Sequence, residues 1–326
     1  MLEQTFFCIR PYIFEKRELI KQMIIDSGLV IKDTKIVWLT RKDVRVIYGH
    51  EEPSVYFDAC MEFMTRGFTE AGIIEGKDAI AKLVELASDT HIPREAKTHT
   101  LRAIFGKTEP INFNGLDYYL NPLHRSRNKD EAEKETALFN ELKLRQPIQI
   151  IQIMMQKLHK DKNLIGVYNH HIKLVVKIGL ELVNELGGDK TVVELACWLH
   201  DIASLTTGDK HEHHIAGAEK AEKILQLLGY DEKTIINVKH CIETHRGSCP
   251  LQKMTSEADI VCNADGMANL KYAPLLYYFA YGKNQLSFEE GLKKIRNKIE
   301  SSWSKLTDYA KIKAKEDYQK WQKLFS

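Results

Sequence analysis

Histidine is concentrated in one part of the 326-residue chain. Eight of its 13 histidines lie between positions 170 and 245, a stretch in which an even distribution would place about three. One of them, His200, directly precedes Asp201 within the apolar segment Trp198–Ile202. Imidazole nitrogens and carboxylate oxygens together bind divalent metal ions. The enrichment therefore predicts a metal centre in the second half of the chain.

Several predicted helices must fold together to bring these groups to one ion. The His200-Asp201 pair lies on a helix whose apolar face includes Leu195 and Leu199. Other imidazoles and acids occur on helices before and after this pair, at His171, His213, His214, His240, His245 and Asp265. A lone His-Asp pair is more often a hydrogen-bonded feature of a core than a metal site. The prediction therefore depends on the convergence of the whole set.

The order of these residues resembles the HD metal-dependent phosphohydrolase superfamily over about residues 160–275. The resemblance rests on four segments, His171–Val175, Leu199–Ile202, His213–Ala218 and Ala258–Asp265. It implies a metal ion held by His171, His200, Asp201 and Asp265. It makes Asp201 a catalytic residue that could bridge to a second ion. The further ligands that it implies, with the choice within each pair left open, are His213 or His214 together with His240 or His245.

This set of ligands points to a defined chemistry. Mixed imidazole and carboxylate ligands suit Mn²⁺, Fe²⁺, Co²⁺, Ni²⁺ or Zn²⁺. A bound ion lowers the pKa of its water, so that hydroxide can attack phosphorus at neutral pH. We therefore expect hydrolysis of a phosphate ester with one or two metal ions. Because some dinuclear members of this superfamily activate oxygen, an iron oxygenase is a second interpretation of the same ligands.

A histidine suited to a different chemistry, His124, lies in the segment Asn121–Ser126, eleven residues before Glu135. Neutral imidazole is a competent nucleophile. Together with Thr5–Pro11 and Thr100–Gly106, this segment resembles the nucleoside diphosphate kinase family over about residues 4–140. The resemblance implies transfer of a γ-phosphoryl group through a phosphohistidine. In this role His124 is the nucleophile and Glu135 is the carboxylate that orients it.

The kinase resemblance also implies a nucleotide site, which takes Mg²⁺ together with its nucleotide. Cationic donors in such a site offset the charge of the moving phosphoryl group. The residues that the resemblance assigns to the phosphates, the ribose, the base and the positioning of His124 are Arg10, Tyr48, Tyr56, Thr90, Arg102 and Asn121.

Departures from the kinase pattern leave the transferase activity open. Arg10 stands where a lysine is expected, and Val84 stands where an arginine that contacts phosphate is expected. The segment Arg125–Arg127 replaces the usual Gly-Ser-Asp, and Lys107–Leu120 is an insertion before His124. Nucleotide binding without efficient turnover is one alternative, and an altered substrate is another.

The pattern of apolar residues divides the chain into two domains of different class. Residues 1–145 combine strand signals, such as Thr5–Ile9, with helical spacing, such as Ala79–Ala87. Residues 146–326 show long amphipathic helices and few strand signals. With the two resemblances, this predicts an α+β chain in which a ferredoxin-like domain precedes an all-α HD domain.

The composition limits the choice of partners. The 47 basic and 45 acidic residues leave a formal charge of +2, too small to indicate nucleic acid or an anionic membrane. No apolar stretch approaches the ~20 residues that span a bilayer. The six cysteines form no Cys-x-x-Cys pair, which favours reduced thiols in a cytoplasmic protein. The expected partner is a nucleotide or phosphate-ester substrate, and the kinase resemblance leaves a homo-oligomer open.

Two phosphate-handling domains on one chain predict a cytoplasmic enzyme of nucleotide metabolism or signalling, with the HD domain as its principal catalyst. The alternative is a nucleotide sensor, in which the first domain binds a nucleotide and regulates hydrolysis in the second. A purely structural role would leave the enrichment in histidine unexplained.

Overall fold

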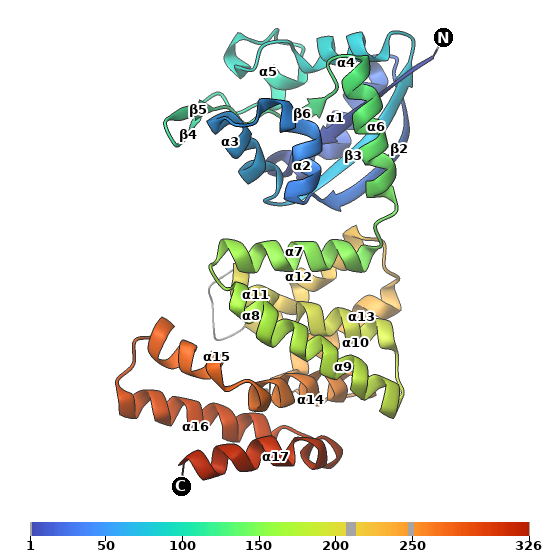
Figure 1. The fold of residues 1–326 in the computed structure, drawn as a ribbon. Coiled ribbons are helices and arrows are strands. Elements are labelled where there is room, and N and C mark those ends of the chain that lie inside the picture. Colours follow the sequence, from blue (N-terminus) through green and yellow to red (C-terminus); the bar gives the residue numbers. More distant parts are fainter. Residues whose placement is uncertain (1, 207–212, 247–250, 326) are drawn as a thin grey trace. The chain divides into compact units, whose positions relative to one another are not determined.

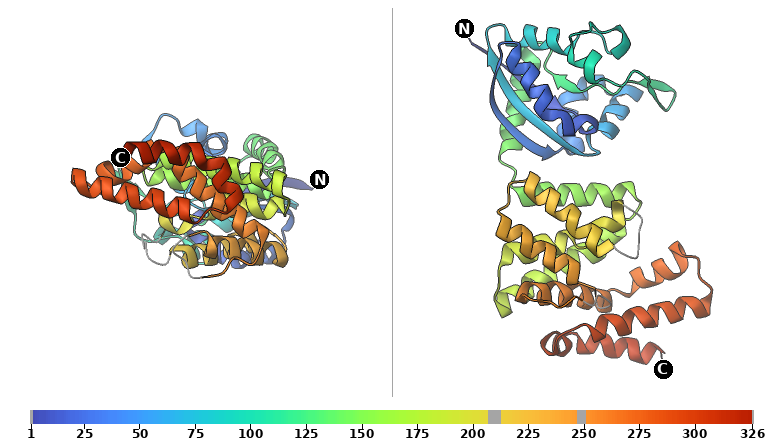
Figure 2. Two further views of the ribbon diagram at one scale, coloured as in Figure 1. Left: turned by 90° about the horizontal axis from the view of Figure 1, so that it is seen from below. Right: turned by 180° about the vertical axis from the view of Figure 1, so that it is seen from behind.

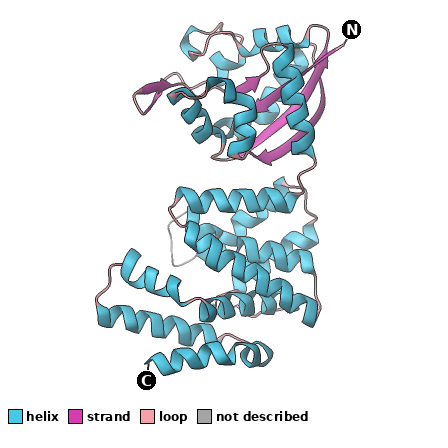
Figure 3. Cartoon of the chain, viewed as in Figure 1, coloured by secondary structure: helices cyan, strands magenta, loops and turns pink. Residues whose placement is uncertain are grey.

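A computed structural model of the chain describes residues 2–206, 213–246 and 251–325 (Figure 1). The chain divides into two compact units, Met1–Met154 and Met155–Ser326. Among the described residues every strand lies in the first unit, and the second consists of helices and their connections (Figure 3). The predicted change from an α+β domain to an all-α domain is confirmed.

An antiparallel sheet forms the centre of the first unit. Its strands are β1 (Glu3–Ile9), β2 (Val30–Trp38), β3 (Phe68–Gly76) and β6 (Leu123–Arg125). They lie in the order β2-β3-β1-β6, so β1 pairs with β3 on one side and with β6 on the other. This is the ferredoxin-like arrangement that the sequence predicts. It places the end of β1 beside β6, the strand that carries His124.

Helices cover both faces of this sheet (Figures 1 and 2). The helices of this unit are α1 (Arg17–Asp26), α2 (Arg41–Tyr48), α3 (Val55–Met64), α4 (Ala79–Ala87), α5 (Leu101–Phe105) and α6 (Lys129–Lys143). Successive side chains of a strand point to opposite faces, and Phe7 and Ile9 share one apolar cluster with residues of α1 and α4. On the other face, α6 packs against β1, and α2 packs against α6. Because both faces are covered, β1 is buried from Thr5 to Ile9.

The insertion before His124 forms a small hairpin. Its strands are β4 (Ile111–Phe113) and β5 (Leu116–Tyr118), which pair antiparallel. The two residues between them, Asn114 and Gly115, have φ angles of 51° and 86°. Tight two-residue hairpins require positive φ at both turn positions, and Asn-Gly adopts it readily. The turn therefore fixes the hairpin, which returns the chain inward at Tyr118.

The second unit is a helical assembly around a buried helix, α14 (Ser256–Lys271). The other helices are α7 (Pro147–Asp161, which spans the division between the units), α8 (Ile165–Val167), α9 (Lys173–Leu186), α10 (Lys190–Leu199), α11 (Ile202–Thr206), α12 (His213–Leu227), α13 (Glu232–Thr244), α15 (Ala273–Tyr277), α16 (Phe288–Ser304) and α17 (Asp308–Phe325). α14 packs against α9, α10, α13, α16 and α17. It therefore contacts helices from before and after it in the sequence.

Capping side chains fix where the central helices begin. The carboxylate of Asp189 accepts from the backbone of Thr191 and Val192 at the start of α10. The hydroxyl of Thr255 accepts from the backbone of Ala258 at the start of α14. Such caps satisfy backbone donors that have no partner within the helix. They set the register in which His200 directly follows α10 and Asp265 lies inside α14.

The last helices form an apolar cluster of their own. α16 and α17 pack against each other and against α14. Trp303 stacks on Tyr318 with ring centroids 4.1 Å apart, and the indole of Trp321 donates to the carbonyl oxygen of Leu270 at 2.8 Å. The first contact joins α16 to α17, and the second joins α17 to α14, the helix that carries Asp265. No helix of the described residues is long and apolar enough to cross a membrane.

Candidate functional site

Three of the residues proposed as metal ligands converge in the second unit. His171 lies in a π-helical turn (Tyr168–Ile172), His200 follows the last residue of α10, and Asp201 comes next. One possible ligand atom from each lies within 4.8 Å of the other two. His171 and His200 are buried, whereas Asp201 is partly accessible. The geometry is therefore that of a candidate metal site with one open side.

Asp265 joins this group from α14. Its Oδ1 lies 3.2 Å from Nε2 of His171 and 3.9 Å from Nε2 of His200. Oδ2 of Asp201 lies 3.5 Å from the same nitrogen of His200. Four residues that span 95 positions of the sequence thus place two imidazole nitrogens and two carboxylates around one small volume. The structure brings together the whole first set of ligands that the HD resemblance implies.

The ring of His200 is oriented for metal binding. Its Nδ1 lies 2.9 Å from the carbonyl oxygen of Cys197, which can only accept, so this nitrogen carries the proton and donates. Its Nε2 is buried and has no hydrogen-bond partner among the described residues. A buried polar atom of this kind requires a partner, and a metal-bound histidine commonly donates its other ring nitrogen to a carbonyl. The donor set and this unsatisfied nitrogen fit a divalent ion.

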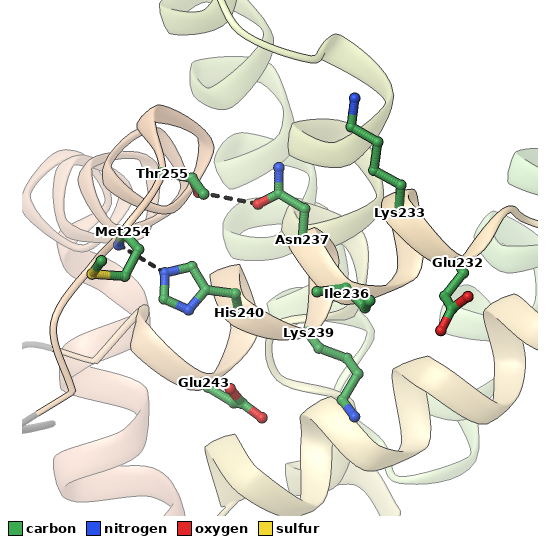
Figure 4. Close-up of a pocket in the computed structure, with 9 residues that line it drawn as sticks. All are labelled: Glu232, Lys233, Ile236, Asn237, Lys239, His240, Glu243, Met254 and Thr255. Carbon is green, nitrogen blue, oxygen red and sulfur yellow. Dashed lines mark hydrogen bonds between the residues drawn. The ribbon is translucent and has the colours of Figure 1, made fainter.

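Of His240 and His245, the structure brings His245 to the group. Its ring centroid lies 5.3 Å from that of His200, and its Nδ1 hydrogen-bonds the carbonyl oxygen of Ile242 at 2.6 Å. His240 lies elsewhere, because its Nε2 accepts from the backbone of Met254 at 2.9 Å. It lines an open pocket of about 820 Å³ on α13 (Figure 4). The inclusion of His240 among the ligands is not supported by this geometry.

The first residues of α12 supply less information. His214 is half-buried near the start of this helix. His211 and the side chain of His213 lie outside the described part of the structure. The choice between His213 and His214 therefore stays as the sequence leaves it.

The electrostatics of the centre favour the metal-binding protonation states. Burial raises the pKa of Asp201, but the neighbouring imidazoles, His200 foremost, bring that pKa below its usual value. Burial also raises the pKa of Asp265, but the charge of Lys305, the hydrogen bond from His171 and the charge of Lys298 together outweigh burial and hold this pKa well below its usual range. Burial, followed by the charge of His200, lowers the pKa of His245. Ionised carboxylates and a neutral imidazole are the forms that bind metal ions.

Lys305 is a component of this centre that the sequence analysis does not include. Its Nζ donates to Oδ2 of Asp265 at 2.5 Å and to the carbonyl oxygen of His245 at 3.0 Å. It follows α16 and lies forty positions beyond Asp265. No local motif surrounds it, so only the packing of α16 on α14 could reveal it.

The second candidate site lies on the sheet of the first unit. His124 is on β6, opposite Cys8 of β1. Its Nε2 lies 2.8 Å from Oε1 of Glu135, and the hydroxyl of Ser126 donates to Oε2 of the same carboxylate at 2.7 Å. A carboxylate accepts from Nε2–H, which leaves the lone pair of a neutral ring on Nδ1. The three side chains are thus arranged to present Nδ1 as a nucleophile.

Arg10 and a group of tyrosines lie beside His124. The guanidinium of Arg10 donates to the hydroxyl of Tyr48 at 2.7 Å and to that of Tyr118 at 2.8 Å. The ring of Tyr48 is 5.0 Å from that of His124, and the ring of Tyr56 is 6.5 Å from that of Tyr48. The structure therefore brings Arg10, Tyr48 and Tyr56 to His124, but it adds Tyr118, which the sequence analysis does not assign.

The remaining nucleotide-site candidates meet at the end of α4. Arg102 donates to the carbonyl oxygens of Ser88, at 3.0 Å, and Thr90. Arg125 donates to the same oxygen of Ser88 at 3.4 Å. Asn121 donates from Nδ2 to the carbonyl oxygen of His91 at 3.3 Å. Arg102, Thr90 and Asn121 thus lie in one neighbourhood, and Arg125 joins them although the sequence analysis treats it only as a departure.

Three arginines near His124 make this neighbourhood strongly cationic. The Nε atoms of Arg10, Arg102 and Arg125 are buried and have no hydrogen-bond partner among the described residues. Burial, followed by the charges of Arg125 and Arg10, lowers the pKa of Arg102 to about 10. Guanidinium groups that repel one another and hold unsatisfied donors are stabilised by an anion. Phosphate oxygens have the charge and geometry for this role.

Comparison with known proteins matches both halves of the chain. The model of the nucleoside diphosphate kinase family matches residues 3–143, and that of the HD domain matches residues 168–270. A nucleoside diphosphate kinase of Chelativorans sp. is 33% identical over 137 residues, which cover 41% of this chain and 90% of that protein. One of Bartonella tribocorum is 30% identical over 147 residues, covering 44% and 97%. The solved kinase from Encephalitozoon cuniculi shares 27% identity, covers 42% of this chain and 88% of its own, and has a TM-score of 0.37.

These matches assign the chain to a class of protein. Its first unit is a nucleotide-handling domain of the kinase type, and its second contains an HD domain, the phosphohydrolase type. Through its N-terminal domain the chain belongs to the nucleoside diphosphate kinase family. The matched relatives correspond to less than half of the chain, so the HD domain is an addition to the part that they share.

Proposed function

We propose that this chain is a two-domain nucleotide-handling enzyme whose junction lies between residues 145 and 146. Its HD domain hydrolyses the phosphate ester of a nucleotide or related compound with a divalent transition metal ion. The observation that carries this proposal is the convergence of His171, His200, Asp201 and Asp265, with Nε2 of His200 buried and unsatisfied among the described residues.

The four ligands would have different roles. When bound, Mn²⁺, Fe²⁺, Co²⁺, Ni²⁺ or Zn²⁺ supplies a hydroxide nucleophile at neutral pH and offsets charge at phosphorus. His171, His200 and Asp265 have side chains that are at most 11% exposed, and these three would hold the metal ion in place. The side chain of Asp201 is 30% exposed. Asp201 is therefore the ligand beside which the substrate phosphate enters, and the one that would bridge to a second ion.

Elemental analysis of the purified full chain tests this part of the proposal. The wild type should retain a divalent transition metal, and His200→Ala and Asp201→Ala should each lose it. His240→Ala should keep the metal, because its Nε2 is occupied by the backbone of Met254. Equal metal content in the wild type and the two ligand variants would contradict the assignment. Hydrolysis assays across mononucleotides, triphosphates and cyclic dinucleotides then identify the substrate.

We also propose that the N-terminal domain transfers a phosphoryl group through His124. Nδ1 of His124 attacks the γ-phosphorus of a Mg²⁺-bound nucleoside triphosphate, the bond from phosphorus to the β-γ bridging oxygen breaks, and the nucleoside diphosphate leaves. A second nucleoside diphosphate takes the phosphoryl group in the reverse reaction. Glu135 holds the ring through Nε2, while Arg10 and Arg102 offset the charge of the moving group.

Labelling with ATP that carries a radioactive γ-phosphate tests this transfer. The wild type should become labelled in the presence of Mg²⁺, and His124→Ala should not. His99→Ala is a matched control, because His99 is an exposed histidine of the same domain. Labelling that persists in His124→Ala would exclude His124 as the nucleophile.

A nucleotide sensor is the second candidate, and one observation favours it. The guanidinium of Arg10 is already bonded to two tyrosine hydroxyls, so a nucleotide phosphate must compete for it. In a sensor, nucleotide binds to the first domain and changes the rate of hydrolysis by the second without labelling His124. The absence of label together with a nucleotide-dependent hydrolysis rate would identify this function.

A further inference from the structure

Lys305 connects the proposed metal centre to helices that lie outside the matched HD domain. The match ends at residue 270, whereas Lys305 follows α16. Its side chain is 6% exposed. Nζ donates to Oδ2 of Asp265 at 2.5 Å and to the carbonyl oxygen of His245 at 3.0 Å. The buried ammonium therefore ties together the chain at Asp265, the end of α13 and the end of α16.

The neighbouring contacts hold Lys305 against α14. Asn263 donates from Nδ2 to the hydroxyl of Thr307 at 3.0 Å, and its Oδ1 accepts from the backbone of Thr307 at 3.0 Å. Gly266 permits the approach, since a Cβ there would lie 2.9 Å from the carbonyl oxygen of Ser302. The residues on either side of Asp265 thus anchor the corner between α16 and α17. This anchoring fixes the position of Lys305 independently of its bond to Asp265.

The two oxygens of Asp265 consequently face different partners. Oδ2 is held by Lys305, whereas Oδ1 lies 3.2 Å from Nε2 of His171 and accepts from Nδ2 of Asn269 at 3.1 Å. The terminal torsion of an aspartate side chain is broad, and a bond at each oxygen restricts it more than the bond from Asn269 to Oδ1 does alone. With Oδ2 held, the carboxylate keeps Oδ1 directed at the other ligands.

We propose that Lys305 is a positioning residue of the metal centre, which holds Asp265 with Oδ1 directed to the metal. The proposal rests on the proposed hydrolase function. It makes the C-terminal helices α16 and α17 a required part of that centre. Lys305 itself does not touch the metal or the reacting phosphate, and it acts through Asp265 and the backbone of His245.

Two physical effects of this lysine oppose each other, and this makes the proposal testable. An ammonium near a divalent cation repels it, so repulsion alone predicts tighter metal binding when Lys305 is removed. A lost tether predicts weaker binding, because residues that orient metal ligands typically contribute 10-fold to 100-fold to metal affinity. The direction of the change therefore decides between the two effects.

The experiment is a titration of the metal-free full chain with Mn²⁺. Lys305→Met should weaken Mn²⁺ binding by about 10-fold to 100-fold. Lys305→Arg keeps a cation that can donate to Asp265, and it should recover part of the affinity. Lys315→Met is the matched control on the exposed surface of α17, and it should bind as the wild type does. If Lys305→Met does not fold, as judged by thermal unfolding, Lys305→Gln takes its place.

Each result has a distinct meaning. Unchanged or tighter Mn²⁺ binding by a folded Lys305→Met protein, with the wild type binding normally, overturns the positioning role and leaves the hydrolase proposal intact. A wild type that binds no Mn²⁺ and no other divalent transition metal overturns both. A lowered melting temperature with unchanged affinity assigns Lys305 to stability alone and likewise overturns the proposal.

Discussion

Arg10 donates a hydrogen bond of 2.8 Å to the hydroxyl of Tyr118, which lies at the end of the inserted hairpin. The ring of Tyr118 is 2% exposed and stacks on Phe63, with centroids 5.0 Å apart and planes 11° apart. It also lies 5.7 Å from the ring of Tyr56. The insertion thus places an aromatic side chain against Arg10 and Tyr56, two residues that the kinase resemblance assigns to the nucleotide site. The hydroxyl of Tyr118 would therefore compete with a nucleotide phosphate for the guanidinium of Arg10.

Removing this hydroxyl should favour nucleotide binding at the cost of stability. Tyr118→Phe keeps the stacked ring but leaves a buried donor of Arg10 without its partner, which costs about 1–3 kcal/mol of unfolding free energy. A phosphate oxygen can then satisfy that donor. We expect tighter ADP binding and a lower melting temperature in the absence of ADP. A calorimetric titration that shows equal or weaker ADP binding would rule out competition at Arg10.

Arg125 should contribute to the binding of phosphate although the kinase pattern places no arginine there. It donates to the carbonyl oxygen of Ser88, beside Arg102, and its Nε is buried without a hydrogen-bond partner among the described residues. Hydrogen bonds to charged groups contribute about 1.5–3 kcal/mol, so Arg125→Met should weaken ATP binding roughly tenfold or more. Arg94→Met, at an exposed arginine, is the control and should leave it unchanged. Equal ATP affinities in Arg125→Met and the wild type would remove Arg125 from the site.

The sequence shows the order of the candidate ligands in the second unit, but it does not show which of their side chains point toward the shared centre. The spacing of His171, His200 and Asp265 predicts a shared centre, and the structure brings these residues together. The choice between His240 and His245 could not be made. Five positions along a helix rotate a side chain by about 140°, so the two face different ways. Which one faces inward depends on how α13 packs against α10 and α14, and this information is not local.

The residues that the sequence analysis does not assign have a common physical origin. Tyr118 reaches Arg10 because a two-residue turn reverses the inserted segment, and Lys305 reaches Asp265 because Gly266 lets α16 approach α14 closely. Each contact joins positions that are 108 or 40 residues apart. Hydrophobic periodicity predicts the elements on which such residues lie. It carries no information about which polar side chains meet across them.

Gly179 on α9 should be required for the packing of the helices that carry the metal ligands. A Cβ at this position would lie 2.6 Å from Sγ of Cys197 on α10 and 3.7 Å from Cβ of Ala264 on α14. Overpacking of a core costs about 1–3 kcal/mol, whereas alanine in place of glycine inside a helix gains up to about 1 kcal/mol. Gly179→Ala should therefore lower the unfolding free energy by about 1–2 kcal/mol, as measured in urea.

A second glycine provides the matched comparison. Gly166 lies in α8, is exposed, and a Cβ there would have no neighbour within 4 Å. Gly166→Ala should be neutral or stabilising by up to about 1 kcal/mol. His200 directly follows α10, and Asp265 lies within α14. Gly179→Ala should therefore also weaken Mn²⁺ binding, and Gly166→Ala should not. The same change in stability for both variants would show that close packing at Gly179 is unimportant.

The pH dependence of stability should depend in part on His159, a buried histidine on α7. Its Nδ1 donates to the carbonyl oxygen of Met155 at 2.7 Å, and its ring lies 5.6 Å from that of Tyr168. Burial lowers the pKa of His159 below its usual 6.5. The unfolded chain therefore takes up this proton at a higher pH than the folded chain does. Its contribution to stability is complete above pH 6.5 and decreases as the pH falls through the folded-state pKa.

Substitution of this histidine isolates its contribution from those of other groups. Unfolding free energies of the metal-free wild type should decrease as the pH is lowered below 6.5. His159→Gln cannot take up the proton, so its stability should decrease less steeply over the same interval. The control is His99→Gln, at an exposed histidine, and its unfolding free energy should decrease with pH as steeply as that of the wild type. Parallel curves for His159→Gln and the wild type would mean that His159 has the same pKa in the folded and the unfolded chain. That result would contradict the lowering of its pKa by burial.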